Sequence, residues 1–261
     1  CWVWTSASSA AAPSRWFLAN FARVRRRVLV VADNKQEDLF LASEGDEWYA
    51  RNAAVLGLDE HARTDPALRI LGQIPSYRPK RVLEVGCSNG WRLARLRERY
   101  GCKTVGVEPS AKAVEDGNKR YPGLDLRRGV AMKLPIGDHE KFDLVICYCV
   151  FMWVSRSALL ASMAEVDRAL EDGGHILLCD FLPDVPARRR YHHLPEGQAY
   201  TYKQDLAQVF LASACYRHVA RTTHHHARQT DDLFDMDVPS DECVVCDILQ
   251  KRNLHVAVDA T

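Results

Sequence analysis

The chain lacks the features of several protein classes. No uninterrupted apolar run in its 261 residues approaches the ~20 residues that a membrane-spanning helix needs, so no membrane span is expected. There is no excess of one charge either, because 35 basic residues face 34 acidic ones. This balance argues against binding of nucleic acid by bulk electrostatics. With 47% hydrophobic and 26% charged residues, disordered, collagenous and coiled-coil interpretations are poor.

The cysteines do not suggest a disulfide framework. Nine of them are scattered along a chain that is too long to need disulfide bonds for stability, so we expect reduced thiols and a cytoplasmic protein. Cys147 and Cys149 alternate along an apolar run and are interpreted as small core residues. Cys243 and Cys246 enclose two valines in another apolar run, where core packing is favoured over a redox turn or a zinc site.

The first thirty residues contain five arginines and no acid. One interpretation is an organelle transit peptide, which is rich in Ser, Ala and Arg. The other, which we favour, is translated upstream sequence with the natural start at Val31. Residues 1–30 are expected to be poorly ordered, and we assign them no functional role. Without these five charges, the net charge of +1 becomes about −4 for residues 31–261.

Strand and helix patterns alternate through the middle of the chain. Short apolar runs predict five strands, at 81–85, 104–107, 124–128, 142–149 and 175–181. Helical spacing of apolar residues predicts helices at 91–100 and, with Ser110 as N-cap, at 110–120. A further helix has its apolar face at Leu159, Met163, Val166 and Leu170 and its end at Gly173-Gly174. This alternation predicts a parallel sheet with helices on both faces.

The last eighty residues follow a different pattern. A helix at 205–214 precedes two strand patterns, 216–225 and 241–250, which are expected to form an antiparallel ribbon at the sheet edge. His224, His225 and His226 end the first of these strands. Because consecutive strand residues point to opposite faces, three in a row do not easily converge on one metal ion. We therefore interpret them as an exposed strand end and expect no metal.

A glycine-rich turn after the first strand carries the strongest functional signal. It reads Glu84-Val-Gly86-Cys-Ser88-Asn-Gly90, and glycines at such a turn let the backbone pass close to a ligand. The G-x-G-x-x-G spacing of dinucleotide sites is absent, and no Lys-Ser/Thr follows as in a P-loop. Glu108 ends the second strand, where an acid can accept hydrogen bonds from ribose hydroxyls. The expected ligand has a ribose, no phosphate chain, and positive character near Glu84.

Over roughly residues 50–182, these motifs resemble those of the class I S-adenosyl-L-methionine (SAM)-dependent methyltransferases. The acid-x-Gly-x-Gly-x-Gly motif of that family matches 84–90, with Ser88 in place of the middle glycine, and its ribose-binding acid matches Glu108. Its Leu-x-x-Gly-Gly turn matches Leu170 to Gly174. The resemblance implies a Rossmann-like α/β fold, with a doubly wound, mostly parallel seven-stranded sheet and an antiparallel C-terminal edge strand. It implies SAM as cofactor, with these contacts: Glu84, Gly86, Ser88, Gly90, Glu108, Val130, Ala131 and Cys147.

One motif departs from the family pattern. Many relatives carry Gly-Asp-Ala after the third strand, where the acid contacts the adenine amino group. Here the chain reads Gly129-Val130-Ala131-Met132. Adenine recognition is therefore expected to depend on backbone groups near Ala131 and on packing from Val130 or Met132. The missing hydrogen bond would cost on the order of 1–2 kcal/mol of cofactor affinity.

The implied reaction is in-line displacement at a sulfonium methyl group, in which the enzyme mainly aligns donor and acceptor and excludes water. A base is needed only if the acceptor must lose a proton. His192 and His193 are the candidates, since the unperturbed pKa of histidine lies near neutrality. Two exposed histidines without a catalytic role are the alternative.

Candidate substrate contacts follow from the rule that ligands of open α/β sheets bind at the carboxyl ends of the strands. A Trp-Tyr-x-Arg sequence in the segment before the first strand is similar to the lid of small-molecule and sugar-modifying methyltransferases, with ordinary helix packing of Trp48 as the alternative. Together these considerations select the following residues: Trp48, Tyr49, Arg51, Phe151, Trp153, Asp180, Tyr200 and Tyr202.

The chain is therefore divided into an N-terminal helical lid (31–75), a SAM-binding core (76–182), a substrate cap (183–204) and a C-terminal helix with antiparallel strands (205–261). The expected function is methyl transfer to a small molecule, a sugar or natural-product intermediate, by a monomer or homodimer with no nucleic-acid or membrane partner. A nucleic-acid methyltransferase is disfavoured because Cys147 to Phe151 lacks the proline of the DNA-enzyme motifs. A protein methyltransferase and a non-catalytic SAM-binding module remain as alternatives.

Overall fold

The computed structural model describes residues 35–74, 76–195, 197–227 and 238–253. These residues belong to one unit of the chain, Asp33–Thr261. The expectation of poor order for residues 1–30 concerns residues outside the described ranges.

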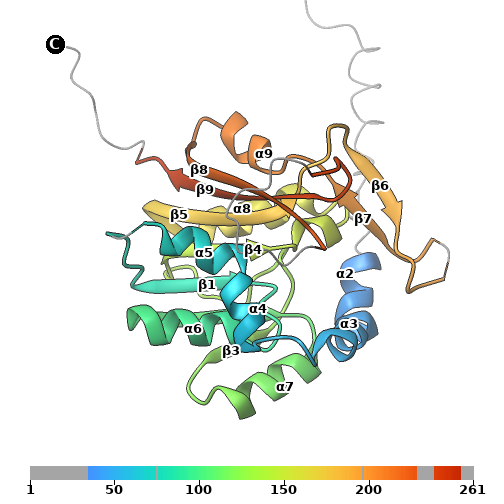
Figure 1. Cartoon of the computed structure of the whole chain (residues 1–261), viewed down its shortest axis with the longest axis horizontal. Coiled ribbons are helices and arrows are strands. Elements are labelled where there is room, and N and C mark those ends of the chain that lie inside the picture. Colours follow the sequence, from blue (N-terminus) through green and yellow to red (C-terminus); the bar gives the residue numbers. More distant parts are fainter. Residues whose placement is uncertain (1–34, 75, 196, 228–237, 254–261) are drawn as a thin grey trace, which may run out of the picture. The chain divides into compact units, whose positions relative to one another are not determined.

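A seven-stranded sheet runs through the centre of this unit in the order β3-β2-β1-β4-β5-β9-β8 (Figure 1). Five strands are mutually parallel: β1 (Arg81–Val85), β2 (Lys103–Glu108), β3 (Asp125–Arg128), β4 (Phe142–Tyr148) and β5 (Leu170–Phe181). β9 (Cys243–Lys251) pairs antiparallel with β5 and with β8 (Tyr216–His225). The predicted doubly wound sheet with an antiparallel C-terminal ribbon is confirmed. β9 is the last strand in the sequence but lies between β5 and β8 in the sheet, so β8 forms the edge.

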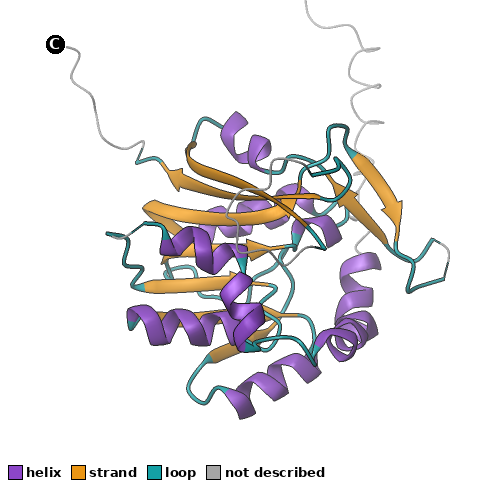
Figure 2. Ribbon diagram, in the orientation of Figure 1, coloured by secondary structure: helices purple, strands orange, loops and turns teal. Residues whose placement is uncertain are grey.

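Helices cover both faces of the sheet (Figure 2). On one face, α5 (Pro66–Gly72) and α6 (Trp91–Tyr100) pack their apolar side chains against those of β1, β4 and β5. On the other face, α8 (Leu159–Ala169) and α9 (Ala207–Ala212) do the same. Alternate residues of β1 divide between the two layers, with Val82 in the first and Leu83 in the second, because successive strand side chains point to opposite faces. Within the described ranges, every helix is too short or too polar to cross a membrane.

Local signals account for most element boundaries. The side chain of Ser110 accepts a hydrogen bond from the Ala113 amide at 3.0 Å, which confirms it as the N-cap of α7 (Ala111–Arg120). The predicted helix end at Gly173-Gly174 is wrong. α8 ends at Ala169, and β5 already begins at Leu170, which pairs with Phe142 across a register shift. This partner on β4 is not visible in the local sequence.

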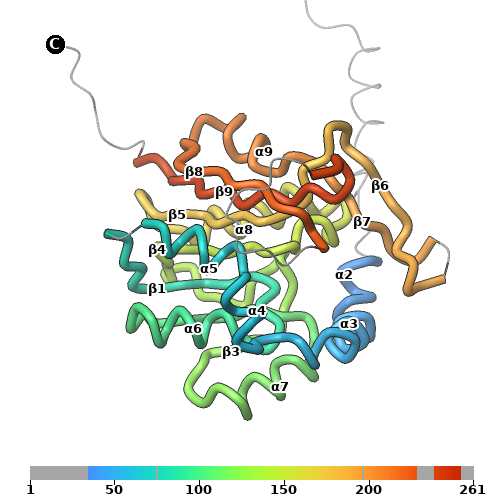
Figure 3. The backbone as a smooth tube through the Cα atoms, in the orientation of Figure 1, coloured from blue at the N-terminus to red at the C-terminus, as the bar shows by residue number. Residues whose placement is uncertain are grey.

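Two further groups of elements lie beyond the carboxyl ends of the parallel strands. The first is a series of short helices: α2 (Lys35–Leu39), the π-helix η1 (Phe40–Glu44), α3 (Gly45–Asn52) and α4 (Asp59–Thr64). The second is a separate hairpin of β6 (Ala187–Arg190) and β7 (Tyr200–Lys203), which comes after β5 in the chain. Its strand β7 contacts the 3-10 helix η2 (Phe151–Trp153). Figure 3 shows α2 and this hairpin on the same side of the molecule, although they are far apart in the sequence. Gln36 of α2 joins them through hydrogen bonds with the Tyr200 backbone.

The cysteines differ from expectation at two places. Cys179 of β5 and Cys246 of β9 form a disulfide bond, so the expectation of reduced thiols is wrong for this pair. The register places them directly opposite each other, with Cα atoms 4.2 Å apart, and a pattern within one strand cannot show this. Cys147 is a core residue as predicted. Cys149 instead follows β4, has a left-handed conformation with φ of 53°, and lines a cavity.

Candidate functional site

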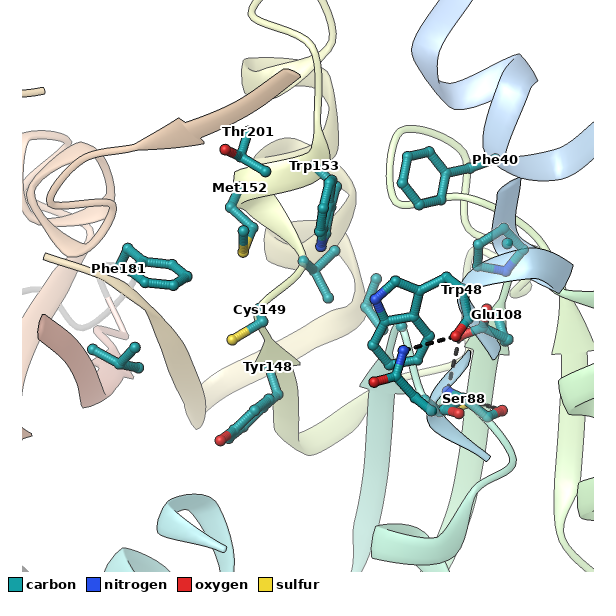
Figure 4. A pocket seen from close by; sticks show the side chains of 18 of the residues that line it. Phe40, Trp48, Ser88, Glu108, Tyr148, Cys149, Met152, Trp153, Phe181 and Thr201 are labelled. Atoms are coloured by element: carbon teal, nitrogen blue, oxygen red, sulfur yellow. Dashed lines mark hydrogen bonds between the residues drawn. The ribbon is translucent and has the colours of Figure 1, made fainter. Parts of the chain in front are cut away.

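A cavity of about 990 Å³ lies at the carboxyl ends of the parallel strands. Its wall includes Ser88 after β1, Glu108 at the end of β2, Cys149 after β4 and Phe181 at the end of β5. In Figure 4, Trp48, Ser88 and Glu108 gather on one side of the cavity, and Phe181, Met152 and Thr201 lie on the other. The volume is at the upper end of the range for ligand sites, about 300–1,000 Å³. It can therefore hold two small molecules side by side.

The glycine-rich turn forms one end of the cavity. Gly86 has φ of +71°, and a Cβ atom added there would lie 2.6 Å from Val150 Cγ2. Its amide and that of Cys87 donate to Val107 O at 2.8 and 3.2 Å, which ties the turn to β2. Ser88 is also left-handed, with φ of 52°, and its buried Oγ has no hydrogen-bond partner within the described part of the chain. A buried hydroxyl without a partner is rare in folded proteins and indicates a missing ligand atom or water.

Glu108 is the acidic group of this end. Its carboxylate accepts hydrogen bonds from the Ser88 amide at 2.8 Å and the Ser110 amide at 2.9 Å, and Figure 4 draws the bond from Ser88. Burial raises the pKa of Glu108 to about 7, although both amides oppose the shift. An ionised carboxylate has about four acceptor positions. Those left over can receive a pair of hydroxyl groups.

A buried ion cluster lies beside the turn. Arg92 of α6 forms ion pairs with Glu84 of β1 and with Asp65, the N-cap of α5. Burial raises the pKa of Glu84 to about 7, whereas Arg92 opposes this shift. Arg92 and Asp65 line the cavity, but Glu84 lies behind them and is fully buried. The predicted direct contact of Glu84 with the cofactor therefore does not fit the structure. Glu84 is connected to the cavity wall only by its ion pair with Arg92.

The other end of the cavity is aromatic with a cationic group. Trp153 packs against Phe40 and Tyr191, with ring centroids 5.5 and 4.7 Å away. The Lys203 ammonium lies 3.6 Å from the centre of the Phe181 ring and donates to Asp241 O at 2.9 Å. Burial, and secondarily the charge of Arg189, lowers the pKa of Lys203. These faces suit a flat or ring-shaped molecule with polar groups.

Known proteins with similar sequences are methyltransferases. Residues 83–178 match the family described as "Methyltransferase domain". A trans-aconitate 2-methyltransferase of Rhodopseudomonas palustris (strain BisB18) is 34% identical over 128 residues, 48% of this chain and 47% of the relative. A phthiotriol/phenolphthiotriol dimycocerosates methyltransferase of Mycobacterium leprae (strain TN) is 34% identical over 170 residues, 62% of this chain and 57% of the relative. The chain thus spans about half the length of the curated relatives that it matches.

Solved structures show the same fold. The 1,6-didemethyltoxoflavin-N1-methyltransferase of Burkholderia thailandensis, bound to its 1,6-didemethyltoxoflavin and S-adenosylhomocysteine, aligns with a TM-score of 0.60 over 95% of this chain and 94% of its own at 15% identity. The N-methyltransferase NodS of Bradyrhizobium japonicum WM9 aligns with a TM-score of 0.53 over 84% and 99% at 16% identity. Residues 83–178 thus match a methyltransferase domain, and the fold is the one that these methyltransferase structures share.

The residues at the glycine-rich turn fit SAM, the cofactor that the sequence motifs imply. Three features suit an adenosyl group without phosphates. The turn has no room for a Cβ atom at Gly86, the Ser88 hydroxyl has no partner within the described residues, and Glu108 has acceptor positions to spare. Val130 and Ala131 line the same cavity, and their packing against adenine stays a prediction.

Besides Glu84, two predicted cofactor residues lie outside the wall of the cavity. Gly90 begins α6 in a left-handed conformation, and an added Cβ would lie 2.9 Å from Leu124 and Leu126. Its role is close packing of the turn. Cys147 is fully buried in the core between the sheet and α8. A direct cofactor contact therefore does not fit either residue.

The predicted substrate residues divide in the same way. Trp48, Arg51 and Trp153 line the cavity. The other five do not: Tyr49, Phe151, Asp180, Tyr200 and Tyr202.

The hydroxyl of Tyr49 is directed to Asp116 at 2.5 Å, and Phe151 is fully buried in the core. The buried carboxylate of Asp180 accepts hydrogen bonds from the amides of Met152 and Phe181 at 3.1 and 2.8 Å. It therefore orders the loops that carry wall residues. The rings of Tyr200 and Tyr202 are each covered by a guanidinium, from Arg188 and Arg156, at 4.5 Å.

His192 and His193 both line the cavity, in the connection between β6 and β7. Their ring centroids are 3.9 Å apart, and Tyr191 beside them accepts a hydrogen bond from Arg51 at 2.7 Å. Partial desolvation, followed by the charges of His192 and Arg51, lowers the pKa of His193. This direction favours the neutral imidazole, which can accept a proton. Both histidine side chains are exposed.

The β8 histidines are not an exposed strand end throughout. His224 is buried, and all three residues of His224–His226 line the cavity. No three His, Cys, Asp or Glu side chains in the described ranges are placed to hold a metal ion. Sequence reasoning also missed wall residues that only the folded chain brings together, among them Phe40 and Tyr148. Arg92 could not be found either, because an arginine on an amphipathic helix usually faces solvent.

Proposed function

We propose that the protein transfers the methyl group of SAM to a small-molecule acceptor bound in the same cavity. The observation that carries this proposal is the continuity of one cavity from Ser88 and Glu108 to Trp153 and Phe181. One end suits an adenosyl group, and the other is aromatic, as required for a second small ligand. The relatives found by sequence are named for methyl transfer to trans-aconitate and to a lipid, phthiotriol dimycocerosate.

Different residues would bind the cofactor and exclude water during the transfer. SAM supplies a methyl group on a positively charged sulfur, which leaves as a neutral thioether. Glu108 would hold the ribose, and the turn at Gly86 would let the adenosyl group approach the backbone. The helices around Gln36 and the β6–β7 hairpin are tied together at the same edge of the sheet, where they would exclude water. For methyl transfer, a protein mainly has to align the methyl donor with the acceptor and to exclude water.

For an acceptor that must lose a proton, His193 is the proposed base, with His192 beside it. The neutral imidazole of His193 meets the first requirement of a base at pH 7, a free lone pair. We propose a sugar or natural-product intermediate as the acceptor. Trp153 and Phe181 offer ring faces, and Lys203 and Thr201 offer donors for hydroxyl or carboxyl groups.

Calorimetry followed by a turnover assay tests the proposal. Titration with SAM and S-adenosylhomocysteine should show one saturable site per chain. Incubation with methyl-labelled SAM and a panel of sugar nucleotides, hydroxylated aromatics and organic acids should release S-adenosylhomocysteine only in the presence of an acceptor. Binding of SAM without turnover across the panel would favour a non-catalytic module instead. Absence of any binding would overturn the proposal altogether.

A further inference from the structure

The end of the cavity at Trp153 and Phe181, here called the acceptor end, contains the ammonium group of Lys203. This side chain is half-buried and lines the cavity. Its Nζ donates to Asp241 O at 2.9 Å and lies 3.6 Å from the centre of the Phe181 ring. An ammonium group has three N–H donors. Lys203 therefore keeps donors for a ligand.

The charge of Lys203 is not neutralised by a nearby acid. Three described acids act on it electrostatically, but none forms an ion pair with it: Asp180, Asp241 and Glu242. Asp241 is paired with Arg189 at 3.3 Å instead. A charge that is partly removed from water is costly unless a group of opposite charge or a hydrogen-bond partner compensates for it. An anionic group on a ligand would provide this compensation.

A hydroxyl group lies on the same strand face as Lys203. Thr201 and Lys203 are two residues apart in β7, so their side chains point to the same side of the hairpin. Both line the cavity, and the Thr201 hydroxyl makes only a long hydrogen bond, to Arg189 O at 3.5 Å. In Figure 4, Thr201 and Phe181 lie on the side of the cavity opposite Glu108. The acceptor end thus offers an ammonium group and a hydroxyl group together.

These donors suit a carboxylate better than a phosphate group. A carboxylate carries one negative charge on two oxygens, which matches one ammonium and one hydroxyl. Phosphate groups are usually bound by several backbone N–H groups or by the fork of an arginine, and the nearby Arg189 is already paired with Asp241. The remainder of the ligand should be apolar, because three apolar wall residues pack together here: Met152, Phe181 and Val244.

We propose that the acceptor is a small carboxylic acid whose carboxylate is bound by the Lys203 ammonium and the Thr201 hydroxyl. The inference rests on the proposed function, because it names the acceptor class of the same cavity. The carboxylate would supply a counter-ion for Lys203, and the apolar part of the acid would pack on Phe181 and Met152. Lys203 then selects acids over the corresponding neutral amides.

The test compares three probes on protein saturated with S-adenosylhomocysteine, by ligand-observed NMR titration. Benzoate and benzamide have nearly the same shape but differ in charge, and phenyl phosphate carries a phosphate group instead. The wild-type complex should bind benzoate about tenfold more tightly than benzamide, as expected for charge-assisted hydrogen bonds. It should also bind benzoate more tightly than phenyl phosphate.

Variants assign this preference to single residues. In Lys203→Gln the ratio of the affinities for benzoate and benzamide should shrink to about twofold or less, because the cation is lost. Lys203→Arg keeps a cation and should keep a preference for benzoate. Thr201→Val should lower the affinity for benzoate about threefold. Lys119→Gln, on α7 with a side chain that is 71% exposed, is the control and should keep the wild-type ratio.

Each outcome decides the matter. No binding of benzoate, equal binding of benzoate and benzamide, or an unchanged ratio in Lys203→Gln would overturn the proposal, and so would tighter binding of phenyl phosphate. If Lys203→Gln does not fold, a crystal structure of the wild-type complex with benzoate decides. A carboxylate oxygen within about 3.2 Å of Lys203 Nζ supports the proposal, and benzoate bound elsewhere overturns it. Failure of the wild-type protein to bind S-adenosylhomocysteine would instead refute the proposed function.

Discussion

Glu108 holds the glycine-rich turn and keeps acceptor positions for a ligand. Because it is buried, its charge is costly unless hydrogen-bond donors surround it. Two amides do so in part, and the ribose hydroxyls of SAM would complete the set. The residue therefore connects the packing of the turn with recognition of the cofactor.

Replacement of this carboxylate should remove cofactor binding selectively. In Glu108→Gln, an amide N–H₂ replaces one acceptor oxygen, so affinity for S-adenosylhomocysteine should fall about tenfold or more, since hydrogen bonds to a charged group contribute about 1.5–3 kcal/mol. Calorimetry measures the change. Glu98→Gln, on the exposed side of α6, is the matched control and should bind normally. Equal affinities of Glu108→Gln and wild type would exclude a role of Glu108 in binding.

Cofactor affinity should also depend on pH. With a pKa of about 7, Glu108 is increasingly protonated below neutrality, and a protonated carboxyl accepts fewer hydrogen bonds. Binding therefore favours the ionised form and releases a proton, so affinity should rise from pH 6 to pH 8, by up to tenfold per unit below the pKa. In the protein without cofactor, the pH dependence of folding stability has the opposite sign to that of cofactor affinity. The raised pKa makes this group's contribution decline as pH rises from about 4.5 to 7. A flat affinity profile from pH 6 to 8 would contradict this.

The difference between Glu108 and Arg92 shows what the sequence can reveal about single residues. Glu108 follows a short apolar strand, and this position alone predicts an acid at the ligand edge. Arg92 is the second residue of helix α6, whose pattern indicates only which side faces the sheet. Its burial depends on Asp65 and Tyr148, which approach from other elements. Such contacts cannot be predicted from a local pattern.

At the scale of elements, one buried amide joins the two groups that lie over the cavity. Gln36 of α2 is 5% exposed. It donates to Tyr200 O at 2.8 Å and accepts from Tyr200 N at 3.0 Å, and it also donates to Trp153 O. It therefore connects the N-terminal helices with η2 and the hairpin.

Loss of this connection should loosen the hairpin. In Gln36→Ala, we expect faster hydrogen–deuterium exchange in β7 and dissociation of S-adenosylhomocysteine about 3–10-fold faster, from the loss of roughly 1 kcal/mol of hydrogen bonding. Exchange mass spectrometry and stopped-flow fluorescence provide the two measurements. Asp38→Ala, on the exposed side of the same helix, should behave as wild type. Unchanged exchange in a folded Gln36→Ala protein would show that the amide does not join these elements.

The disulfide between β5 and β9 makes a second prediction at this scale. It closes a loop with a sequence separation of 67 residues, so its removal should lower the free energy of unfolding by about 2–4 kcal/mol. Wild-type protein refolded in reductant should lose this amount in urea denaturation, whereas Cys246→Ala should be insensitive to reductant. Thiol titration of the unfolded wild-type chain should find two fewer thiols before reduction than after. Equal thiol counts would contradict the bond.

Elements with strong local signals were predicted closely. β1, α6 and β8 have the predicted bounds, because glycines or a change of period mark their ends. The hairpin of β6 and β7 was not predicted as regular structure. Each of its strands has only four residues and no apolar run, so the local sequence carries little signal for a strand. The disulfide was missed for the same reason, since it depends on register between strands.

At the scale of the whole molecule, the sheet sets the position of everything else. Parallel strands bring Ser88, Glu108, Cys149 and Phe181 to one edge. The segments before and after the core, α2 to α5 and β6 to β9, add the remaining walls. In the proposed function, the residues that bind the cofactor come mainly from the core, and those that bind the acceptor come mainly from the added segments. That pattern would let acceptor specificity vary while the cofactor end stays fixed.

A crystal structure of the protein with S-adenosylhomocysteine tests this account most directly. We expect the ribose hydroxyls within hydrogen-bond distance of Glu108 and the adenine beside Val130 and Ala131. The sulfur should point toward Cys149 and Trp153. A nucleoside bound outside this cavity, or one whose ribose does not reach Glu108, would contradict the account.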